Sequence, residues 1–159
     1  MRPSAWTITE APGIGSIPPY NSDVQGSDGV PADVTALAEA IHAADVVIIA
    51  SPEYNCSMLG VLKNALDWVS RTEDQPFKNK PVCLQSVSMG QLGGARMQYH
   101  LGQVMVFLGA DVFTVPEVFI GAGHQKFDAD TLALTDGPTR EVVGKQLAVF
   151  VDYIGRVSA

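Results

Sequence analysis

The sequence predicts an α/β protein built around a parallel β-sheet. Short apolar segments alternate with longer segments of helical periodicity, and this alternation is typical of parallel sheets. The chain has 159 residues, which fits one domain, so we expect residues 1–159 to form a single domain with its own core. Its proportions of hydrophobic (47%) and charged (17%) residues are those of an ordinary globular protein.

Charge and cysteine content narrow the partners and the compartment. A formal net charge of -7 disfavours nucleic acid and anionic membrane surfaces as partners. Cys56 and Cys83 are too few for a disulfide framework, so we expect free thiols in a reducing compartment. Residues 1–6 lack a signal-peptide core, and the longest apolar run, residues 46–50, is too short to span a bilayer. These features together predict a cytoplasmic protein.

The first half of the chain contains two expected strands and one expected helix. Residues 6–9 form a weak strand, and residues 11–29 are a long loop because glycine and proline are frequent there. Pro31 suits the first turn of a helix, and apolar spacing extends that helix over residues 31–43. Residues 46–50 are the clearest strand, and their uniformly apolar character predicts burial on both faces of the sheet.

The second half continues the alternation. Apolar residues at helical spacing predict a helix over residues 59–69, followed by a strand at 82–87. A further helix over residues 97–108 should end at Gly109, which is placed as a C-cap. The last strand covers residues 111–115 and resumes at 118–120, and Pro138 opens the final helix.

The first candidate binding segment, residues 51–57, directly follows a strand. Ligands of open parallel sheets bind beyond the carboxyl ends of the strands. Pro52 stiffens the segment, Tyr54 offers an aromatic face, and Glu53, Asn55 and Ser57 offer hydrogen-bonding groups. This combination suits a planar polar heterocycle. An ordinary strand-to-helix loop, capped by Ser57, explains the same residues about equally well.

The second candidate segment, residues 88–94, follows the next strand and holds three glycines within five residues. Glycine lets the backbone approach a ligand closely and present its N–H groups. Phosphate and flavin sites both use such loops, and a flexible turn is the alternative.

Longer motifs around both segments resemble the NADPH-dependent FMN reductases. Pro52, Glu53, Tyr54 and Asn55 resemble the flavin loop of that family. Residues of the following helix match as well, namely Gly60, Leu62, Lys63, Asn64, Ala65, Asp67, Trp68, Ser70 and Arg71. Residues 88–90, 93–96 and 98–101 are similar to the chromate and quinone reductase branch. The resemblance extends from about Ile8 to Val157.

The resemblance implies a flavodoxin-like, three-layer α/β/α fold with a parallel sheet, with FMN as cofactor and NAD(P)H as co-substrate. The residues implied to bind FMN are Pro52, Glu53, Tyr54, Asn55, Cys56, Ser88 and Gly90. Cys56 stands where an aromatic residue is common in the family. No catalytic side chain is implied, because the flavin carries the chemistry. The three histidines show no metal-ligand spacing, so we expect no metal.

The resemblance also implies a subunit interface. Arg96, Tyr99 and Glu117 match residues that form a polar network between subunits in the reductase branch. A homodimer or homotetramer is therefore expected.

One family feature has no counterpart in the sequence. Family members begin with a strand, a phosphate loop of the form Gly-Ser-x-Arg-x-x-Ser-x-Asn, and a helix, and nothing here matches that unit. Its strand would be the first and central strand of the sheet, so we expect that strand to be missing and the chain to be N-terminally truncated. Unpaired backbone groups on its neighbours would cost about 1–3 kcal/mol each.

Two functions follow from these observations. The resemblance implies transfer of electrons from NAD(P)H through FMN to quinones, chromate or similar small acceptors. The alternative is a non-catalytic flavodoxin-like module that has lost FMN binding and acts through protein contacts. The absent phosphate loop favours the module, and retention of both candidate binding segments favours the enzyme.

Overall fold

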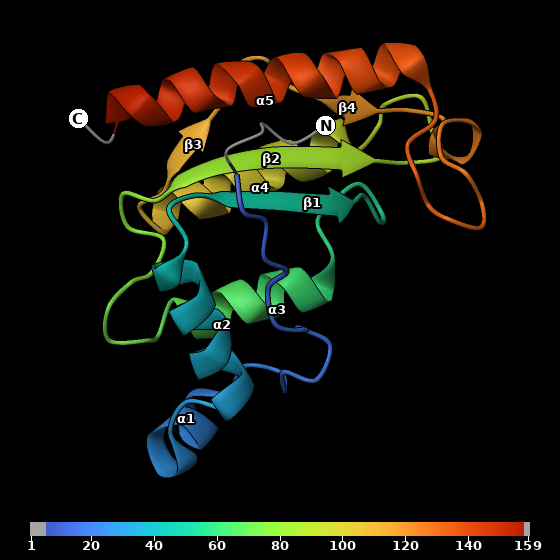
Figure 1. The fold of residues 1–159 in the computed structure, drawn as a ribbon. Helices are drawn as coiled ribbons and strands as arrows, with labels where there is room; N and C mark the ends of the chain where they lie inside the picture. Colours follow the sequence, from blue (N-terminus) through green and yellow to red (C-terminus); the bar gives the residue numbers. More distant parts are fainter. Residues whose placement is uncertain (1–5, 158–159) are drawn as a thin grey trace.

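A parallel sheet with helices on both faces forms the centre of the molecule (Figure 1). The structure is a computed structural model and describes residues 6–157. The strands are β1 (Val47–Pro52), β2 (Pro81–Val87), β3 (Asp111–Phe113) and β4 (Phe119–Ile120). The helices are α1 (Ser22–Asp28), α2 (Ala32–Ala43), α3 (Gly60–Val69), α4 (Ala95–Phe107) and α5 (Gly137–Val157), with a 3-10 turn, η1 (Gly123–Gln125). The expected α/β class with a parallel sheet is confirmed.

β2 is the strand to which all the others pair. β1 lies parallel to it, in register from Val47 opposite Val82 to Pro52 opposite Val87. On its other edge, β3 pairs with the beginning of β2 and β4 with its end. β3 and β4 are thus two pieces of one strand position, interrupted by the segment that holds the cis peptide bond between Val115 and Pro116. The strand expected to run to residue 115 therefore ends at Phe113.

The larger core lies on the face of the sheet covered by α2, α3 and α4. Val82 and Leu84 of β2 are buried there together with Trp68 of α3 and Leu101 of α4. The Trp68 indole donates a hydrogen bond to the carbonyl oxygen of Pro18 at 2.8 Å. This bond satisfies the one polar group of a buried tryptophan and attaches the N-terminal segment to α3.

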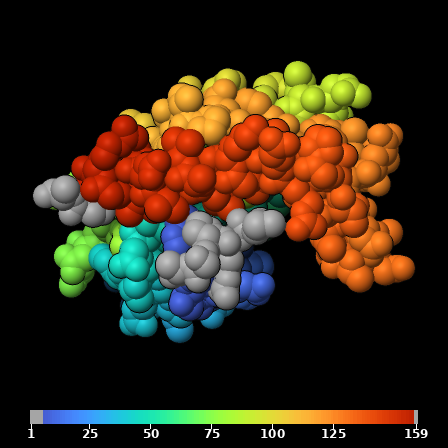
Figure 2. Space-filling model, turned by 45° about the horizontal axis from the view of Figure 1, so that its top comes forward, coloured from blue at the N-terminus to red at the C-terminus, as the bar shows by residue number. Residues whose placement is uncertain are grey.

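The opposite face is covered by α5, which extends across the molecule in the space-filling view (Figure 2). A smaller cluster of Cys83, Phe113 and Phe150 is buried beneath it. Burial raises the pKa of the Cys83 thiol to about 12, because the apolar surroundings disfavour the thiolate.

The expectation that the strand at residues 46–50 is buried on both faces was wrong. β1 alternates between more and less exposed residues, and Ile48, on the α5 side next to Cys83, is 37% exposed. Within residues 6–157, β1 pairs on one edge only, with β2. An apolar strand sequence thus does not by itself ensure cover on both faces.

Two expectations for the N-terminal segment were also wrong. Residues 6–9 form no strand, and Trp6 instead packs edge-on against Phe150 with ring centroids 6.1 Å apart. Part of the expected loop is α1, whose N-cap Asn21 accepts a hydrogen bond from the backbone N–H of Asp23 at 2.8 Å. Side-chain capping of this kind allows a short helix to form in a segment rich in glycine and proline.

The remaining helices agree with the sequence. Gly109 follows α4 in a left-handed conformation (φ 74°), as expected for its C-terminus. Its N–H donates to the carbonyl of Val106, and the N–H of Ala110 donates to Met105, which completes a Schellman motif. Across residues 6–157, no helix has the length and apolar character needed to cross a lipid bilayer.

Candidate functional site

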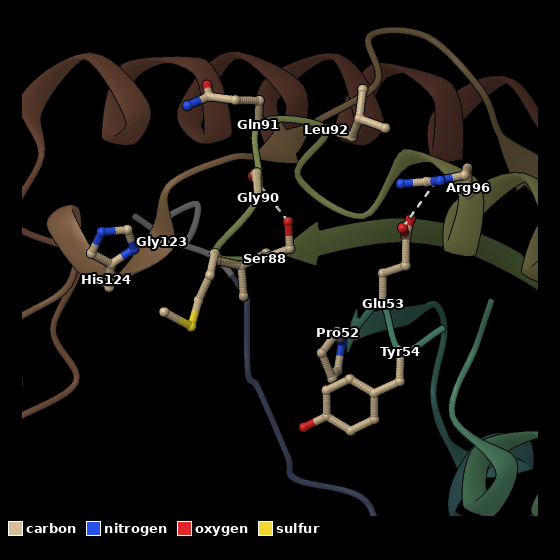
Figure 3. Close-up of a pocket in the computed structure, with 12 residues that line it drawn as sticks. Pro52, Glu53, Tyr54, Ser88, Gly90, Gln91, Leu92, Arg96, Gly123 and His124 are labelled. Carbon is tan, nitrogen blue, oxygen red and sulfur yellow. Dashed lines mark hydrogen bonds and ion pairs between the residues drawn. The ribbon is translucent and has the colours of Figure 1, made fainter. Parts of the chain in front are cut away.

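A cavity of about 590 Å³ opens at the carboxyl ends of β1 and β2 (Figure 3). Three segments and one helix residue form its walls. The residues that line it are Pro52, Glu53, Tyr54, Val87, Ser88, Met89, Gly90, Gln91, Leu92, Arg96, Gly123 and His124. A ligand site is expected at this place in an open parallel sheet.

The first wall ends in a tight turn after β1. The backbone N–H of Tyr54 donates to the carbonyl of Ser57 at 3.1 Å, and the N–H of Ser57 donates back at 3.0 Å. Between them, Asn55 and Cys56 both have positive φ angles, 51° and 65°, as in a type I′ turn. Asn tolerates this conformation readily, whereas a cysteine there is unusual. The turn leaves Tyr54 62% exposed at the cavity.

An ion pair joins this turn to the beginning of α4. Arg96 Nε lies 3.1 Å from Glu53 Oε1, and the backbone N–H of Met97 donates to Glu53 Oε2 at 3.2 Å. The Glu53 side chain is only 10% exposed, and it lies where the helix dipole favours a negative charge. Arg96 Nη1 also donates to Cys56 Sγ at 3.0 Å. Glu53 and Arg96 therefore hold the turn in a defined position against α4.

A buried hydrogen-bond network holds residues 88–94, the glycine-rich loop, against Ser86 at the end of β2. Ser86 Oγ donates to the carbonyl of Gly93 at 2.6 Å and accepts from Gln98 Nε2 at 2.7 Å. Gln98 Nε2 also donates to the carbonyl of Val118 at 2.8 Å. Gly94 has a φ of 91°, and a Cβ there would lie 2.5 Å from the Ser86 Cβ. Only glycine fits, so the close contact of loop and strand requires Gly94.

The far wall is pinned to the end of β2 by backbone hydrogen bonds. The N–H of Ser88 donates to the carbonyl of Ile120 at 3.0 Å, and the N–H of Gly123 donates to the carbonyl of Ser88 at 2.9 Å. The N–H of Ala122 donates to the carbonyl of Gly90 at 3.3 Å. η1 and the glycine-rich loop therefore form one backbone unit, and His124 of η1 lines the cavity.

The loop also presents backbone donors. Within residues 6–157, the N–H groups of Met89, Gly90, Gln91 and Leu92 have no hydrogen-bond partner, and all four residues line the cavity. Groups of free N–H donors beside an open cavity suit an electron-rich or negatively charged ligand.

The structure brings most of the expected binding residues together. Pro52, Glu53, Tyr54, Ser88 and Gly90 line the cavity. Asn55 and Cys56 do not line it; they form the turn behind Tyr54.

Of the three expected interface residues, Arg96 lines the cavity as well. The Tyr99 hydroxyl donates a hydrogen bond to Glu117 Oε2 of the same chain, with 3.3 Å between the two oxygen atoms. The negative charge of Glu117 raises the pKa of the Tyr99 hydroxyl.

Sequence reasoning missed several lining residues, and they fall into two groups. Val87, Met89, Gln91 and Leu92 belong to the strand end and loop that were already singled out, so their positions gave a usable signal. Gly123 and His124 lie outside both candidate binding segments. They reach the cavity wall because β4 pairs with the end of β2, and no local sequence motif predicts that pairing.

The parallel sheet, its two helical layers and the cavity at the strand ends define a flavodoxin-like protein. The sequence matches the family described as NADPH-dependent FMN reductase over residues 7–125. The chain belongs to this family, and it is an oxidoreductase that uses FMN and NAD(P)H.

Known proteins similar to this chain agree with that assignment. A quinone reductase of Escherichia coli strain K12 is 48% identical over 157 residues, covering 99% of this chain and 84% of that protein. The NAD(P)H-dependent FMN reductase PA1204 of Pseudomonas aeruginosa is 44% identical over 144 residues, covering 91% and 77%. The structure of FerB, a flavoenzyme NAD(P)H:(acceptor) oxidoreductase from Paracoccus denitrificans, superposes with a TM-score of 0.80 at 32% identity, covering 91% and 79%.

The cavity fits the ring system of FMN. It joins an aromatic side chain, an apolar rim and free backbone N–H donors, which together suit a flat, electron-rich heterocycle. Residues 6–157 contain no counterpart of the family's strand, phosphate loop and helix. The fit therefore concerns the ring of the cofactor rather than its phosphate.

Proposed function

We propose that this chain is an NAD(P)H-dependent quinone reductase that uses FMN. The observation that carries the proposal is the cavity at the ends of β1 and β2, which is lined both by Tyr54 and by residues 89–92, whose N–H groups are free. Family membership supplies the cofactor and the reductant, and the relatives named quinone reductase or NAD(P)H:quinone oxidoreductase supply the acceptor class. Bound FMN accepts electrons from NAD(P)H and passes them on.

The chain's own residues would bind and orient the flavin. Tyr54 and Pro52 would contact the ring, and Ser88 and Gly90 would approach it from the end of β2. Glu53, whose carboxylate is engaged by Arg96 and the N–H of Met97, would act through the position of the turn. Asn55 and Cys56 would act in the same way, because they shape the turn. The free N–H groups would favour negative charge on the reduced flavin.

The proposal also covers assembly and location. Arg96, Tyr99 and Glu117 lie on or beside α4, and Tyr99 is more than half exposed. We propose that this surface contributes to a homodimer or homotetramer. The proposed location is the cytoplasm, since the enzyme depends on NAD(P)H and both cysteines are free thiols.

The experiment that tests the function is cofactor retention followed by turnover. The purified chain is mixed with FMN and desalted, and its visible absorbance is recorded. The retained flavin should be bleached by NADPH or NADH without oxygen and should recover when a quinone is added. Chromate as acceptor stays a prediction that the same assay tests. A colourless protein would contradict the enzyme and favour the non-catalytic module.

Removal of the Tyr54 ring tests the placement of the flavin. Tyr54→Ala should weaken FMN binding by about tenfold, as expected for the loss of about 1–1.5 kcal/mol of aromatic contact. Tyr54→Phe is the matched control, because it keeps the ring and removes only the hydroxyl. Titration of FMN followed by flavin fluorescence measures both variants. Equal affinities for Tyr54→Ala and wild type would rule out contact between Tyr54 and the flavin.

A further inference from the structure

One histidine occupies the cavity wall opposite Tyr54 and Arg96. The His124 imidazole lies across the opening from the turn that follows β1, with Ser88 and Gly90 between them (Figure 3). Histidine is the side chain that ordinarily changes charge between pH 5 and 8, so it can give or take a proton under physiological conditions.

The backbone that carries His124 is held tightly although its side chain is exposed. A Cβ on the preceding Gly123 would lie 2.4 Å from Val87 Cγ2, which shows how closely η1 packs on the end of β2. Ala122, the N-cap of η1, has a φ of 51° and donates to Gly90. The backbone contacts of Ala122 and Gly123 fix the position of His124 relative to the end of β2, and the imidazole can reorient about its own side-chain bonds.

His124 differs from the other two histidines in its bonding. His42 Nε2 lies 3.0 Å from the carbonyl of Asp74, and His100 Nδ1 lies 3.0 Å from Ser57 Oγ. No hydrogen bond or ion pair joins the His124 ring to another part of residues 6–157. Its ring nitrogens are therefore available to a molecule in the cavity.

The other ionisable groups of the cavity are less suited to proton donation. Glu53 and Arg96 form an ion pair with each other, and a tyrosine hydroxyl is a much weaker acid than an imidazolium. On the side of η1, Lys126 follows two residues later, and Asp136 lies just before α5. Hydrogen bonds from Thr139 chiefly lower the pKa of the Asp136 carboxyl, and the charge of Lys126 lowers it further. Among the lining residues, His124 alone offers an imidazole, and within residues 6–157 its ring has no other hydrogen-bond partner.

Quinone reduction consumes protons that such a donor can supply. A quinone becomes a hydroquinone by gaining two electrons and two protons. If the electron pair and one proton arrive as hydride, which NAD(P)H ultimately supplies, the second carbonyl oxygen still needs a proton. A side chain positioned as general acid supplies it faster than water does.

We propose that His124 is the general acid that protonates the acceptor's carbonyl oxygen during quinone reduction. In this step a new O–H bond forms on the acceptor, the N–H bond of the imidazolium breaks, and the neutral imidazole regains a proton from water. The assignment rests on the proposed quinone reductase function and adds the residue that donates the proton.

The test compares two acceptors on reduced, FMN-loaded enzyme. Reduction of tetramethylbenzoquinone consumes protons, whereas ferricyanide takes one electron and no proton. The quinone ring is fully methylated, so it has no ring hydrogen that the exposed Cys56 thiol could replace in a side reaction. His124→Ala should slow reoxidation by the quinone by about 100-fold, the lower end of the range typical of general acid catalysis, and leave the rate with ferricyanide unchanged. The His124→Gln side chain can still donate a hydrogen bond to the acceptor but cannot change its charge. The inflection in the pH profile of the quinone rate should therefore be lost. His42→Gln, on α2, is the matched control.

A second measurement does not depend on turnover. Hydroquinone is titrated into the wild-type protein, with and without FMN, while the ring-proton resonances of the three histidines are followed by NMR. The resonance assigned to His124, identified by its loss in His124→Gln, should shift, and that of His42 should stay.

Three results would overturn the role of His124. They are an unchanged quinone rate in His124→Ala, an equal loss with quinone and ferricyanide, and a His124 resonance that stays in place when hydroquinone saturates the protein. Failure of the proposed function is distinct, because it appears in the wild type as absent flavin or absent reduction by NAD(P)H.

Discussion

The two faces of the sheet differ in how completely they are covered. Three helices, α2, α3 and α4, cover one face, and the side chains of Val82 and Leu84 are buried there in a large apolar cluster. A single helix, α5, covers the other face, where the buried cluster consists of Cys83, Phe113 and Phe150. The same strand, β1, contributes to both faces, and its residue on the α5 side, Ile48, is 37% exposed.

This difference shows that burial follows from the elements packed on a strand, whereas apolar character is a property of the strand itself. Ile48 and Ile49 are identical residues at neighbouring positions, yet Ile49 packs against the larger cluster and Ile48 does not. The free energy lost on truncation should therefore differ between the faces.

The largest effect is expected in the larger core. Trp68→Ala removes a fully buried indole and its hydrogen bond to Pro18, and should lower the free energy of unfolding by about 3–5 kcal/mol. Denaturation in urea, monitored by circular dichroism, measures the change. A loss below about 1 kcal/mol would mean that the three-helix face contributes far less than its burial indicates.

The next comparison concerns two glycines that pack on β2 from opposite faces. Gly94 meets Ser86 on the three-helix face and has φ 91°, whereas Gly123 meets Val87 on the α5 face. Gly94→Ala combines a steric clash with backbone strain and should cost about 1–3 kcal/mol or more, exceeding Gly123→Ala. Gly102→Ala, in open space on α4, is the control and should be neutral or stabilising. The reverse order, measured by thermal unfolding, would show that the α5 face is the less tolerant of the two.

A pH effect is specific to the α5 face. The pKa of Cys83 is raised by burial from 9.0 to about 12, so the folded protein keeps the proton that the unfolded chain releases above pH 9. Stability should be unaffected below pH 8 and should fall as pH rises from 9 to 12, by about 1 kcal/mol at pH 10. Urea denaturation of wild type and Cys83→Ala at pH 8 and pH 10 measures this difference. Equal pH dependence in both proteins would contradict the burial of this thiol.

The smallest effect is expected at the exposed side of β1. Ile48→Ala should cost about 1 kcal/mol or less, because part of the side chain is already in water. Leu84 is buried on the other face of the sheet, and Leu84→Ala is the matched comparison, which should cost about 2–5 kcal/mol. Chemical denaturation of the two variants side by side decides the point. Similar losses would mean that both faces are covered equally in solution.

Local sequence signals predicted the elements wherever one interaction dominates. The uniform apolar run of β1 and the apolar spacing of α2, α3 and α4 produced these elements at nearly the expected positions. Where tertiary contacts compete, the sequence was insufficient. Residues 6–9 have strand-like composition, yet Trp6 packs on Phe150 rather than pairing, and Asn21 caps a helix within an expected loop.

The candidate site divides along the same line. Pro52, Tyr54 and Ser88 could be identified from sequence, because each lies in a motif that directly follows a strand. The ion pair of Glu53 with Arg96 joins residues 43 positions apart, and His124 reaches the cavity only because β4 pairs with the end of β2. Local composition determines which segments become strands, helices and turns. Pairing and packing across the chain decide which side chains share a cavity, because those contacts depend on distances in space rather than on spacing in sequence.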